Sequence, residues 1–516
     1  MTAGVAGTPA DTPHGRERRR GQLALHAALI LAACGFSLWV TRRGIVVVSD
    51  SLGYEEMART ALAGKPLTDA TWPPGYPVAL AAGMAAGLSF EAAARLLNHL
   101  CLPLSAGLFL WALRQLGCRP GTGTLLLLSL FCGSTVVLDV HWAAQSEPLF
   151  LPLCLAGLGG LLAAASLGGW RPLAGGALAL GLAALVRYAG VFLAPVPILA
   201  CAWSSRRSRV QTAVRAAAAG ALTLVPSALF GLSAWSGRHP GGPRQVAVHP
   251  AGAEKLTELG RTALSWFFPT GLANVVPPAA GAACGALFAL AWLALPIFHG
   301  ARRERGESVV AAAGALYLAG VLASISLADY HIPLDSRILF PLYVLALLLI
   351  PSWGRLVGRG RARTALLVAL SVFACASAGR TLRYGAAYAR SHPGYNAATW
   401  RDAPFIPLVT ALPPDVVVIS NADRLVERYT GRPVLPMPRQ YDAMTLRPTD
   451  DLRGLGERLR SATGARPRLA LLILEQERRP CHEDPETVAR ALELTPAREG
   501  PGWRLLATPG VDGAPR

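Results

Sequence analysis

Long uncharged apolar runs recur along residues 21–380 and constrain the fold more than any other feature of the sequence. About 20 consecutive apolar residues can cross the hydrocarbon core of a bilayer as a helix. The candidate spans are residues 21–41, 96–113, 120–138, 148–170, 172–186, 188–205, 216–237, 262–301, 308–328, 338–354 and 364–379. Hydrophobic residues make up 52% of the chain and charged residues 16%, which is unusual for a soluble enzyme of 516 residues. The sequence therefore predicts a polytopic α-helical membrane protein with about eleven transmembrane helices.

The net charge of +18 indicates membrane orientation rather than a nucleic-acid partner, because clusters of arginine flank alternate runs. These arginines are Arg16, Arg18, Arg19, Arg20, Arg114, Arg119, Arg206, Arg207, Arg209, Arg215, Arg302, Arg303, Arg305, Arg355, Arg359, Arg361 and Arg363. The pattern predicts a plasma or inner membrane location, a cytoplasmic N-terminal tail at residues 1–20 and an extracytoplasmic C-terminus. Arg42 and Arg43 break the pattern, and two readings stay open: contact with anionic headgroups or a substrate phosphate, or interfacial anchoring.

From about residue 381 the pattern becomes that of a soluble domain, because charged residues return and the apolar runs shorten. Short apolar runs predict buried strands, and amphipathic spacing predicts helices. The predicted elements are strands at Val416–Ser420 and Leu469–Leu474 and helices at Asp451–Ala462 and Pro485–Leu492. We therefore expect a transmembrane domain at residues 21–380 and a small extracytoplasmic α/β domain at residues 381–516.

The segment from Ser49 to Pro77 places an acid, aromatic residues and a proline-rich turn directly after the first span. Its first half has the spacing of an amphipathic helix lying in the membrane interface, ended by Gly64. Asp50 would then lie at the membrane surface, where a carboxylate can act as a base on lipid-borne substrates. From the spacing alone, an N-cap for the helix that begins near Leu52 is an equally good reading of Asp50.

The same segment resembles the first extracytoplasmic loop of the GT-C membrane glycosyltransferases, the group that includes the protein O-mannosyltransferases and the lipid A aminoarabinose transferase. The matching residues are Asp50, Tyr54, Ala58, Gly64 and the run Pro73-Pro74-Gly75-Tyr76-Pro77, with weaker similarity at Ser146–Phe150, Arg187–Gly190 and Arg337–Pro341. The resemblance implies that the loop at residues 42–91 is catalytic and that Asp50 is the catalytic residue. Members of the group often carry two adjacent acids where this chain has Ser49 and Asp50, and Glu55 or Glu56 is a candidate for the second one.

Further polar residues stand near the predicted outer ends of the spans, where ionisable groups need a partner or a water-filled cavity. The candidates for substrate binding are Tyr54, Tyr76, His141, Glu147, Arg187, His331 and Arg337. Each has a structural alternative. It is interfacial anchoring for the tyrosines, hydrogen bonding within the fold for His141 and Glu147, which cluster with Asp139, and a structural role for the lone His331. For Arg187 the alternative is pairing with an acid, and for Arg337 it is pairing with Asp329 or Asp335. Arg337 would suit a phosphate, because a guanidinium forms paired hydrogen bonds with oxyanions.

Together these features predict a membrane glycosyltransferase that moves a sugar from a polyprenyl-phosphate carrier to an envelope lipid, glycan or protein on the outer face. By resemblance, the anomeric centre is inverted. No P-loop or dinucleotide-binding motif calls for a nucleotide, no metal motif is present, and a divalent cation is left open as a cofactor. The alternatives are a transporter or flippase of lipid-linked sugars and a non-catalytic envelope assembly protein.

Overall fold

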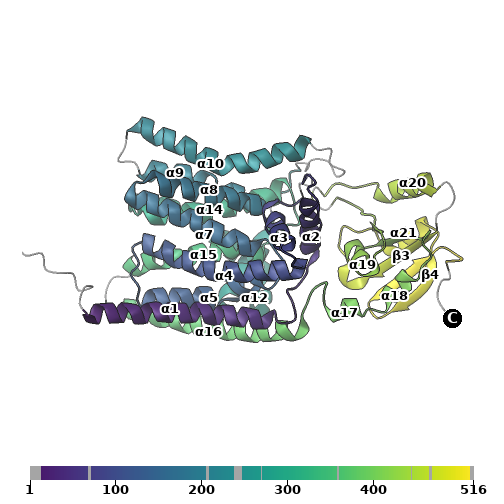
Figure 1. The fold of residues 1–516 in the computed structure, drawn as a ribbon, viewed down its shortest axis with the longest axis horizontal. Helices are drawn as coiled ribbons and strands as arrows, with labels where there is room; N and C mark the ends of the chain where they lie inside the picture. The colour runs from purple at the N-terminus through teal and green to yellow at the C-terminus, as the bar shows by residue number, and fades with distance from the viewer. Residues whose placement is uncertain are drawn as a thin grey trace, which may run out of the picture.

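The computed structural model consists of a long helical bundle with a small α/β domain at one end (Figure 1). The structure describes residues 13–67, 71–204, 208–236, 247–250, 252–268, 270–356, 360–442, 444, 446–463 and 468–511. The helices of the bundle run side by side along its long axis, and the first and last of them, α1 and α16, lie next to each other (Figure 1). The predicted fold class is confirmed.

Eight helices in the described residues are long and apolar enough to cross a membrane. They are α1 (Pro13–Val40), α4 (Phe90–Gln115), α7 (Glu147–Leu167), α10 (Arg209–Ser236), α13 (Pro278–Ala301), α14 (Arg305–Leu327), α15 (Ser336–Leu356) and α16 (Arg361–Ser391). A ninth span exists if α5 (Thr122–Cys132) and the segment Thr135–His141 are counted together, although they are bent by 54°. That segment comprises α6 (Thr135–Leu138) and the 3-10 helix η2 (Asp139–His141).

The structure differs from the eleven predicted spans at three places. The apolar runs at 172–186 and 188–205 form shorter pieces, namely α8 (Trp170–Val186), η3 (Tyr188–Leu193) and α9 (Pro195–Ser204). The run at 262–301 divides into the end of the amphipathic helix α11 (Ala253–Phe267), the short α12 (Thr270–Asn274) and the span α13, which starts after Pro277. The bend between α5 and α6 lies at Gly133 and Ser134, where the apolar run itself shows no break.

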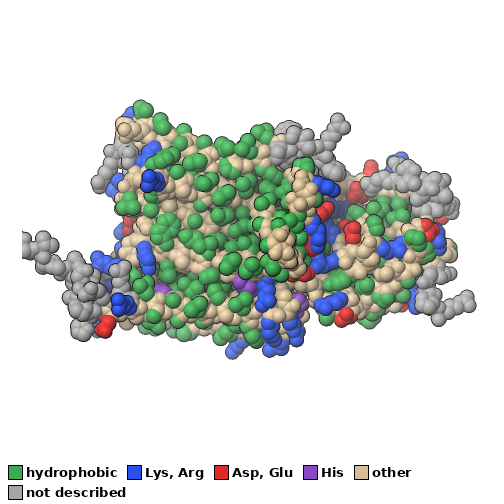
Figure 2. Space-filling model, viewed as in Figure 1, with side chains coloured by type: hydrophobic (Ala, Val, Ile, Leu, Met, Phe, Trp, Pro, Cys, Tyr) green, Lys and Arg blue, Asp and Glu red, His purple; other side chains and the backbone are tan. Residues whose placement is uncertain are grey.

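The outer helices of the bundle present apolar side chains to their surroundings, as lipid-facing helices do. In α10, α13 and α16, only 17% of the most apolar window is buried, against 72% in α7 and α14 and 67% in α15. Figure 2 shows hydrophobic side chains over the length of the bundle and charged side chains near its two ends. The core of the bundle is therefore built around α7, α14 and α15.

Two short helices lie at the end of the bundle that faces the α/β domain: α2 (Ser49–Leu62) and α3 (Gly75–Ala85) (Figure 1). The buried face of α2 includes Leu52, Tyr54, Met57 and Ala58. The chain leaves α2 through Gly64, whose φ of 66° falls in the left-handed region that glycine adopts without strain. The predicted amphipathic helix and its glycine stop are thus present.

The C-terminal domain is a five-stranded sheet with helices on both faces. Its strands are β1 (Val417–Ser420), β2 (Val434–Pro436), β3 (Leu469–Leu474), β4 (Thr495–Gly500) and β5 (Trp503–Ala507), in the order β2-β1-β3-β5-β4. The first three are parallel, and β5 is antiparallel to β3 and β4. Residues of α18 (Phe405–Thr410) and α19 (Asp423–Thr430) pack on one face, and residues of α20 (Asp451–Thr463) and α21 (Pro485–Ala491) pack on the other.

The helix α16 continues to Ser391, beyond the domain boundary expected at residue 381. The segment after it binds the chain that leads into α2. The Tyr395 N–H donates to the Val47 carbonyl at 2.7 Å, and the Asn396 side chain bonds Ile45 and Val47 backbone atoms at 2.8 and 3.1 Å. The short α17 (Ala398–Arg401) then leads into the sheet domain.

Candidate active site

Four charged side chains meet at the end of the bundle beneath the C-terminal domain. Asp50 stands in the first turn of α2, Glu147 in the first turn of α7, Arg337 in the first turn of α15, and Arg187 directly after α8. Arg337 Nη1 lies 3.0 Å from Asp50 Oδ2 and 3.6 Å from Glu147 Oε1. Arg187 Nη1 lies 2.5 Å from the same Glu147 oxygen. The four groups therefore form one chain of alternating charge, which we call the charge cluster.

The charge cluster runs from a buried end to an accessible end. The side chain of Glu147 is 0% exposed, those of Arg187 and Arg337 are 14% and 27% exposed, and that of Asp50 is 37% exposed. A carboxylate without solvent needs a fixed cation, and Arg187 supplies it for Glu147. Asp50 is thus the carboxylate of the cluster that an incoming molecule can reach most readily.

Tyrosines and a serine extend the charge cluster on the side of α2. The Tyr54 hydroxyl donates to Ser146 Oγ at 3.2 Å, and Arg187 Nη1 donates to the same oxygen at 3.1 Å. Burial, together with the carboxylates of Glu147 and Asp50, raises the pKa of Tyr54, so its hydroxyl remains a hydrogen-bond donor at neutral pH. The Tyr76 ring packs edge-on against Tyr54, with 5.1 Å between the ring centroids.

Asp335 holds Arg337 from the loop before α15. Its Oδ1 accepts the Ile338 N–H at 2.9 Å, and Oδ2 lies 4.0 Å from Arg337 Nε. Burial raises the pKa of the Asp335 carboxyl, while Arg337 opposes that shift. The alternative pairing expected for Arg337 is thus present, but the closest carboxylate is that of Asp50.

Asp50 does not act as the N-cap of α2, so that structural alternative is wrong. The cap position is Val48, whose N–H donates to Ser51 Oγ at 2.9 Å. The Ser51 hydroxyl in turn donates to the Ala144 carbonyl at 2.7 Å. The serine therefore fixes the start of the helix, and the Asp50 carboxylate is left to face Arg337.

The sequence placed Asp139, His141 and Glu147 in one polar group, and the structure separates them. Asp139 forms a side-chain hydrogen bond with Tyr384 of α16. The His141 ring is buried, and its Nδ1 lies 2.8 Å from the Val137 carbonyl of its own turn. Of the three residues, only Glu147 belongs to the charge cluster, because Asp139 bonds a tyrosine of α16 and His141 bonds the backbone of its own turn.

His331 also lies outside the charge cluster. Its ring is exposed and stacks with Tyr441 of the C-terminal domain, with 6.3 Å between the ring centroids. Glu55 pairs with Arg59 at 2.7 Å and with Arg428 of α19 at 2.6 Å, and Glu56 lies 3.9 Å from Arg424, so neither belongs to the charge cluster. The other carboxylate of the charge cluster is Glu147, nearly a hundred residues further along the chain.

Two polar residues of this region were absent from the predicted site. Ser146 accepts hydrogen bonds from Tyr54 and Arg187. Asn98 is fully buried in the apolar α4, and its Nδ2 donates to the Ala143 carbonyl at 2.7 Å while Oδ1 accepts from the Tyr76 hydroxyl at 3.5 Å. A lone amide inside an apolar run is a signal that the sequence did offer.

The described residues contain no group of three His, Cys, Asp or Glu side chains that could hold a metal ion. In the charge cluster, each carboxylate already has an arginine within 3.0 Å. The chemistry proposed below therefore assigns its steps to these carboxylates and arginines.

Comparison with solved structures identifies the fold. The chain matches ArnT from Cupriavidus metallidurans bound to undecaprenyl phosphate with a TM-score of 0.50 and 16% identity, over 96% of this chain and 99% of that one. The protein has the GT-C fold. The apo state of the same ArnT matches over 95% of this chain and 98% of that one, with 16% identity and a TM-score of 0.49. An oligosaccharyltransferase from Archaeoglobus fulgidus matches over 79% and 62%, with 12% identity and a TM-score of 0.47.

No protein-family model matches the chain, and no curated protein matches it in sequence. The GT-C fold is therefore established by structure, in agreement with the resemblance noted in the loop around Asp50. That loop lies at one end of the spans and faces the C-terminal α/β domain (Figure 1).

Proposed function

We propose that this multi-pass membrane protein is a glycosyltransferase that takes a sugar from a polyprenyl-phosphate carrier and transfers it to an envelope acceptor on the outer face of the membrane. The observation that carries this proposal is the charge cluster, in which the accessible carboxylate of Asp50 lies 3.0 Å from the guanidinium of Arg337. The cluster thus joins a base and a phosphate-binding group, the two functions that such a transfer needs.

Arg337 has two carboxylate neighbours besides Asp50, so it can exchange Asp50 for another anion and stay in place. Its Nη1, the nitrogen that contacts Asp50, also lies 3.6 Å from Glu147, and its Nε lies 4.0 Å from Asp335. A lipid-linked phosphate entering the site would replace Asp50 as the nearest anionic partner of Arg337, because a guanidinium binds phosphate in the same forked geometry as carboxylate. Donor binding would thereby release the Asp50 carboxylate for the acceptor.

In the transfer step, the acceptor hydroxyl oxygen attacks the anomeric carbon and forms the new glycosidic bond. The bond between that carbon and the phosphate oxygen breaks, and the electron pair stays on the leaving phosphate, which Arg337 stabilises. Asp50 accepts the proton of the hydroxyl as the bond forms. Attack from the side opposite the phosphate gives inversion at the anomeric carbon.

The buried half of the charge cluster keeps this geometry fixed. Glu147 is fully enclosed and paired with Arg187, and the same Glu147 oxygen faces Arg337. Tyr54 and Arg187 share Ser146 Oγ, which ties α2 to the start of α7. Glu147 and Arg187 are thus positioning residues in this proposal, while Asp50 and Arg337 touch the reactants.

Two measurements test the proposal. Mass spectrometry of lipids, glycans and envelope proteins from cells with and without the protein identifies the missing sugar, and transport of lipid-linked sugar without any such loss would favour a transporter. With the donor so identified, donor titrations on the purified protein in lipid nanodiscs compare Arg337→Lys and Arg337→Ala with wild type.

The lysine variant keeps the charge but loses the planar fork, so the apparent donor affinity should fall, and it should fall further in the alanine variant. Arg468→Lys is the matched control, because Arg468 forms an exposed pair with Asp415 at 3.1 Å in the C-terminal domain. Unchanged donor affinity in both Arg337 variants would leave Arg337 as a structural partner of Asp50 and Asp335 only.

A further inference from the structure

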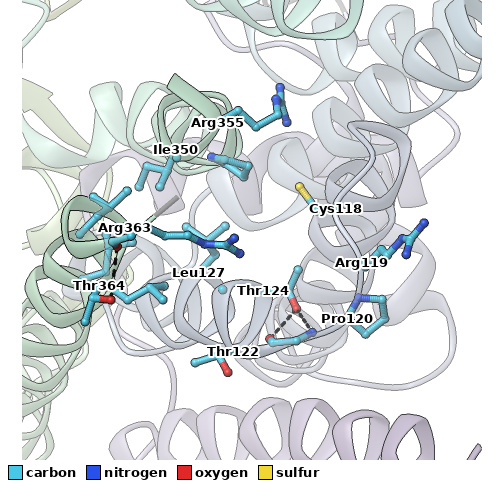
Figure 3. A pocket seen from close by; sticks show the side chains of 18 residues that line it. Cys118, Arg119, Pro120, Thr122, Thr124, Leu127, Ile350, Arg355, Arg363 and Thr364 are labelled. Atoms are coloured by element: carbon cyan, nitrogen blue, oxygen red, sulfur yellow. Dashed lines mark hydrogen bonds between the residues drawn. The ribbon is translucent and has the colours of Figure 1, made fainter. Parts of the chain in front are cut away.

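A large cavity lies at the end of the bundle opposite the charge cluster. It has a volume of about 1040 Å³, is open on one side, and is lined by the α4–α5 connection, the start of α5, the end of α15 and the start of α16 (Figure 3). Arg337 stands in the first turn of α15, whereas the cavity is lined by the last turns of the same helix, from Ile350 to Arg355. The cavity is therefore separated from the proposed site of transfer by the length of a membrane-spanning helix.

The polar part of the cavity is positively charged. The described residues that line it include Arg119, Arg355 and Arg363 and no acidic residue. Arg355 is neutralised by an ion pair with Glu307 of α14. Within the described part of the chain, Arg119 and Arg363 form no ion pair. Figure 3 shows the Arg363 side chain extending from α16 into the cavity, toward Leu127 of α5.

The start of α5 adds backbone donors on the same side. The Gly121 N–H before the helix donates to Thr124 Oγ1 at 2.9 Å, whereas an α-helix leaves its next N–H groups without a partner in the helix, and the helix dipole places partial positive charge there. Gly123 leaves this backbone uncovered, since no heavy atom lies within 4 Å of the position that a Cβ would take. The arginines and the helix start together favour an anion rather than a cation in this part of the cavity.

The remainder of the cavity wall is apolar. It is formed by Leu127, Ile350, Pro351, Leu366, Leu367 and Leu370. These side chains belong to α5, α15 and α16, and α16 is an outer helix with only 17% of its most apolar window buried. An acyl chain would bury its apolar surface against this wall, whereas a free phosphate would gain nothing from it. The cavity thus matches a molecule with an anionic head and an apolar tail.

We propose that this cavity binds an anionic phospholipid, with its headgroup phosphate between Arg119 and Arg363 and an acyl chain along the leucines of α5 and α16. Basic pockets between helices at a membrane surface bind anionic headgroups in this way. The site is independent of glycosyl transfer, since none of its residues belongs to the charge cluster.

The test uses the delipidated full-length protein in detergent and native mass spectrometry. The probes are dioleoyl-phosphatidylglycerol, dioleoyl-phosphatidylcholine and inorganic phosphate. We expect one molecule of phosphatidylglycerol to bind more tightly than phosphatidylcholine, and we expect inorganic phosphate not to displace it. Arg119→Gln/Arg363→Gln should weaken phosphatidylglycerol binding by about tenfold or more.

The control is Arg114→Gln/Arg209→Gln, which removes two exposed arginines at the same end of the bundle that do not line the cavity. A second variant, Gly123→Leu, fills the cavity without changing its charge, and it should weaken binding as well. An equal loss of phosphatidylglycerol affinity in the control variant would overturn the proposal, because it would show that the lipid is attracted by positive charge alone. Displacement by inorganic phosphate, or unchanged binding in both cavity variants, would also overturn it.

Discussion

The pairing of Glu147 with Arg187 gives a stability prediction whose size follows from burial. The Glu147 side chain is 0% exposed, and its Oε1 lies 2.5 Å from Arg187 Nη1. Replacing Glu147 by glutamine leaves the Arg187 cation, itself only 14% exposed, with Ser146 Oγ as its remaining close partner among the described residues. Removing one member of a buried pair costs about 3–5 kcal/mol. We expect Glu147→Gln to lower the unfolding free energy by that amount.

A double-mutant cycle separates this cost from other effects. Arg187→Met removes the nearer cation while keeping an extended side chain, and it should also be destabilising, because Glu147 then keeps only the longer contact of 3.6 Å with Arg337. Glu147→Gln/Arg187→Met leaves no buried charge of the pair, so it should cost clearly less than the sum of the two single variants, with a coupling energy above about 1 kcal/mol.

The assay is unfolding of the full-length protein in mixed micelles with a rising fraction of dodecyl sulfate, followed by tryptophan fluorescence. The exposed pair of Arg468 and Asp415, whose side chains are 41% and 57% exposed, is the control. A double-mutant cycle on this control pair should give a coupling energy of about 0–1 kcal/mol. If the Glu147 and Arg187 variants are simply additive, the buried pair does not hold the site together and the reasoning is refuted.

Three further predictions concern the contacts around the site. Arg428→Ala removes the hydrogen bonds that Arg428 donates to Glu55 at 2.6 Å and to Glu91 at 2.5 Å, and it should weaken the contact of α19 with α2 by about 2 kcal/mol. Faster hydrogen exchange in α19 would report this, and unchanged exchange would contradict it. Gly53→Ala places a Cβ 2.5 Å from the Trp72 ring and should reduce both thermal stability and transfer rate, measured by scanning fluorimetry and turnover. Burial and neighbouring arginines lower the pKa of His482 to about 4, below its usual value near 6.5, so the stability it contributes is present above pH 6.5 and is lost as the pH falls toward 4; His482→Gln should flatten this part of the pH profile of unfolding.

The local elements of the C-terminal domain could be predicted from the sequence. Leu469–Leu474 is a continuous apolar run, and it forms the central strand β3 with all six residues buried. Pro485 begins α21 because Asp484 caps it, with Oδ2 accepting the Thr487 N–H at 3.1 Å. By contrast, β4 carries no apolar pattern, since its residues are mostly exposed, and only its pairing with β5 defines it.

The membrane part was predictable in outline but not in its breaks. An apolar run states only that a segment can be buried in lipid, so it does not distinguish one long helix from two short ones. The bend of 54° between α5 and the segment Thr135–His141 arises in such a run. The same limit explains why residues 172–205 were counted as two spans, although their apolar runs are short.

The members of the charge cluster were named from the sequence, but their partners were not. Asp50 and Arg337 are 287 positions apart, and no local spacing relates them. Arg187 was recognised as unusual because it interrupts apolar residues. A buried cation needs a counter-charge, so pairing with an acid was expected, but the sequence did not identify that acid as Glu147. The contact of His331 with Tyr441 was not predictable, because a loop at the membrane edge can face either the bundle or the C-terminal domain, and tertiary packing decides between them.

The most direct measurement of the central claim is the transfer rate of Asp50→Asn, using purified protein in nanodiscs with the donor found by the mass-spectrometric comparison. Asp50 is 37% exposed, and Arg337 keeps Glu147 and Asp335 as partners, so the thermal midpoint should stay near that of wild type. The rate should fall by about a hundredfold or more, because asparagine cannot accept the proton. Asp415→Asn, in the exposed pair, is the control and should keep full activity. An Asp50→Asn variant that retains most of its activity would contradict the account.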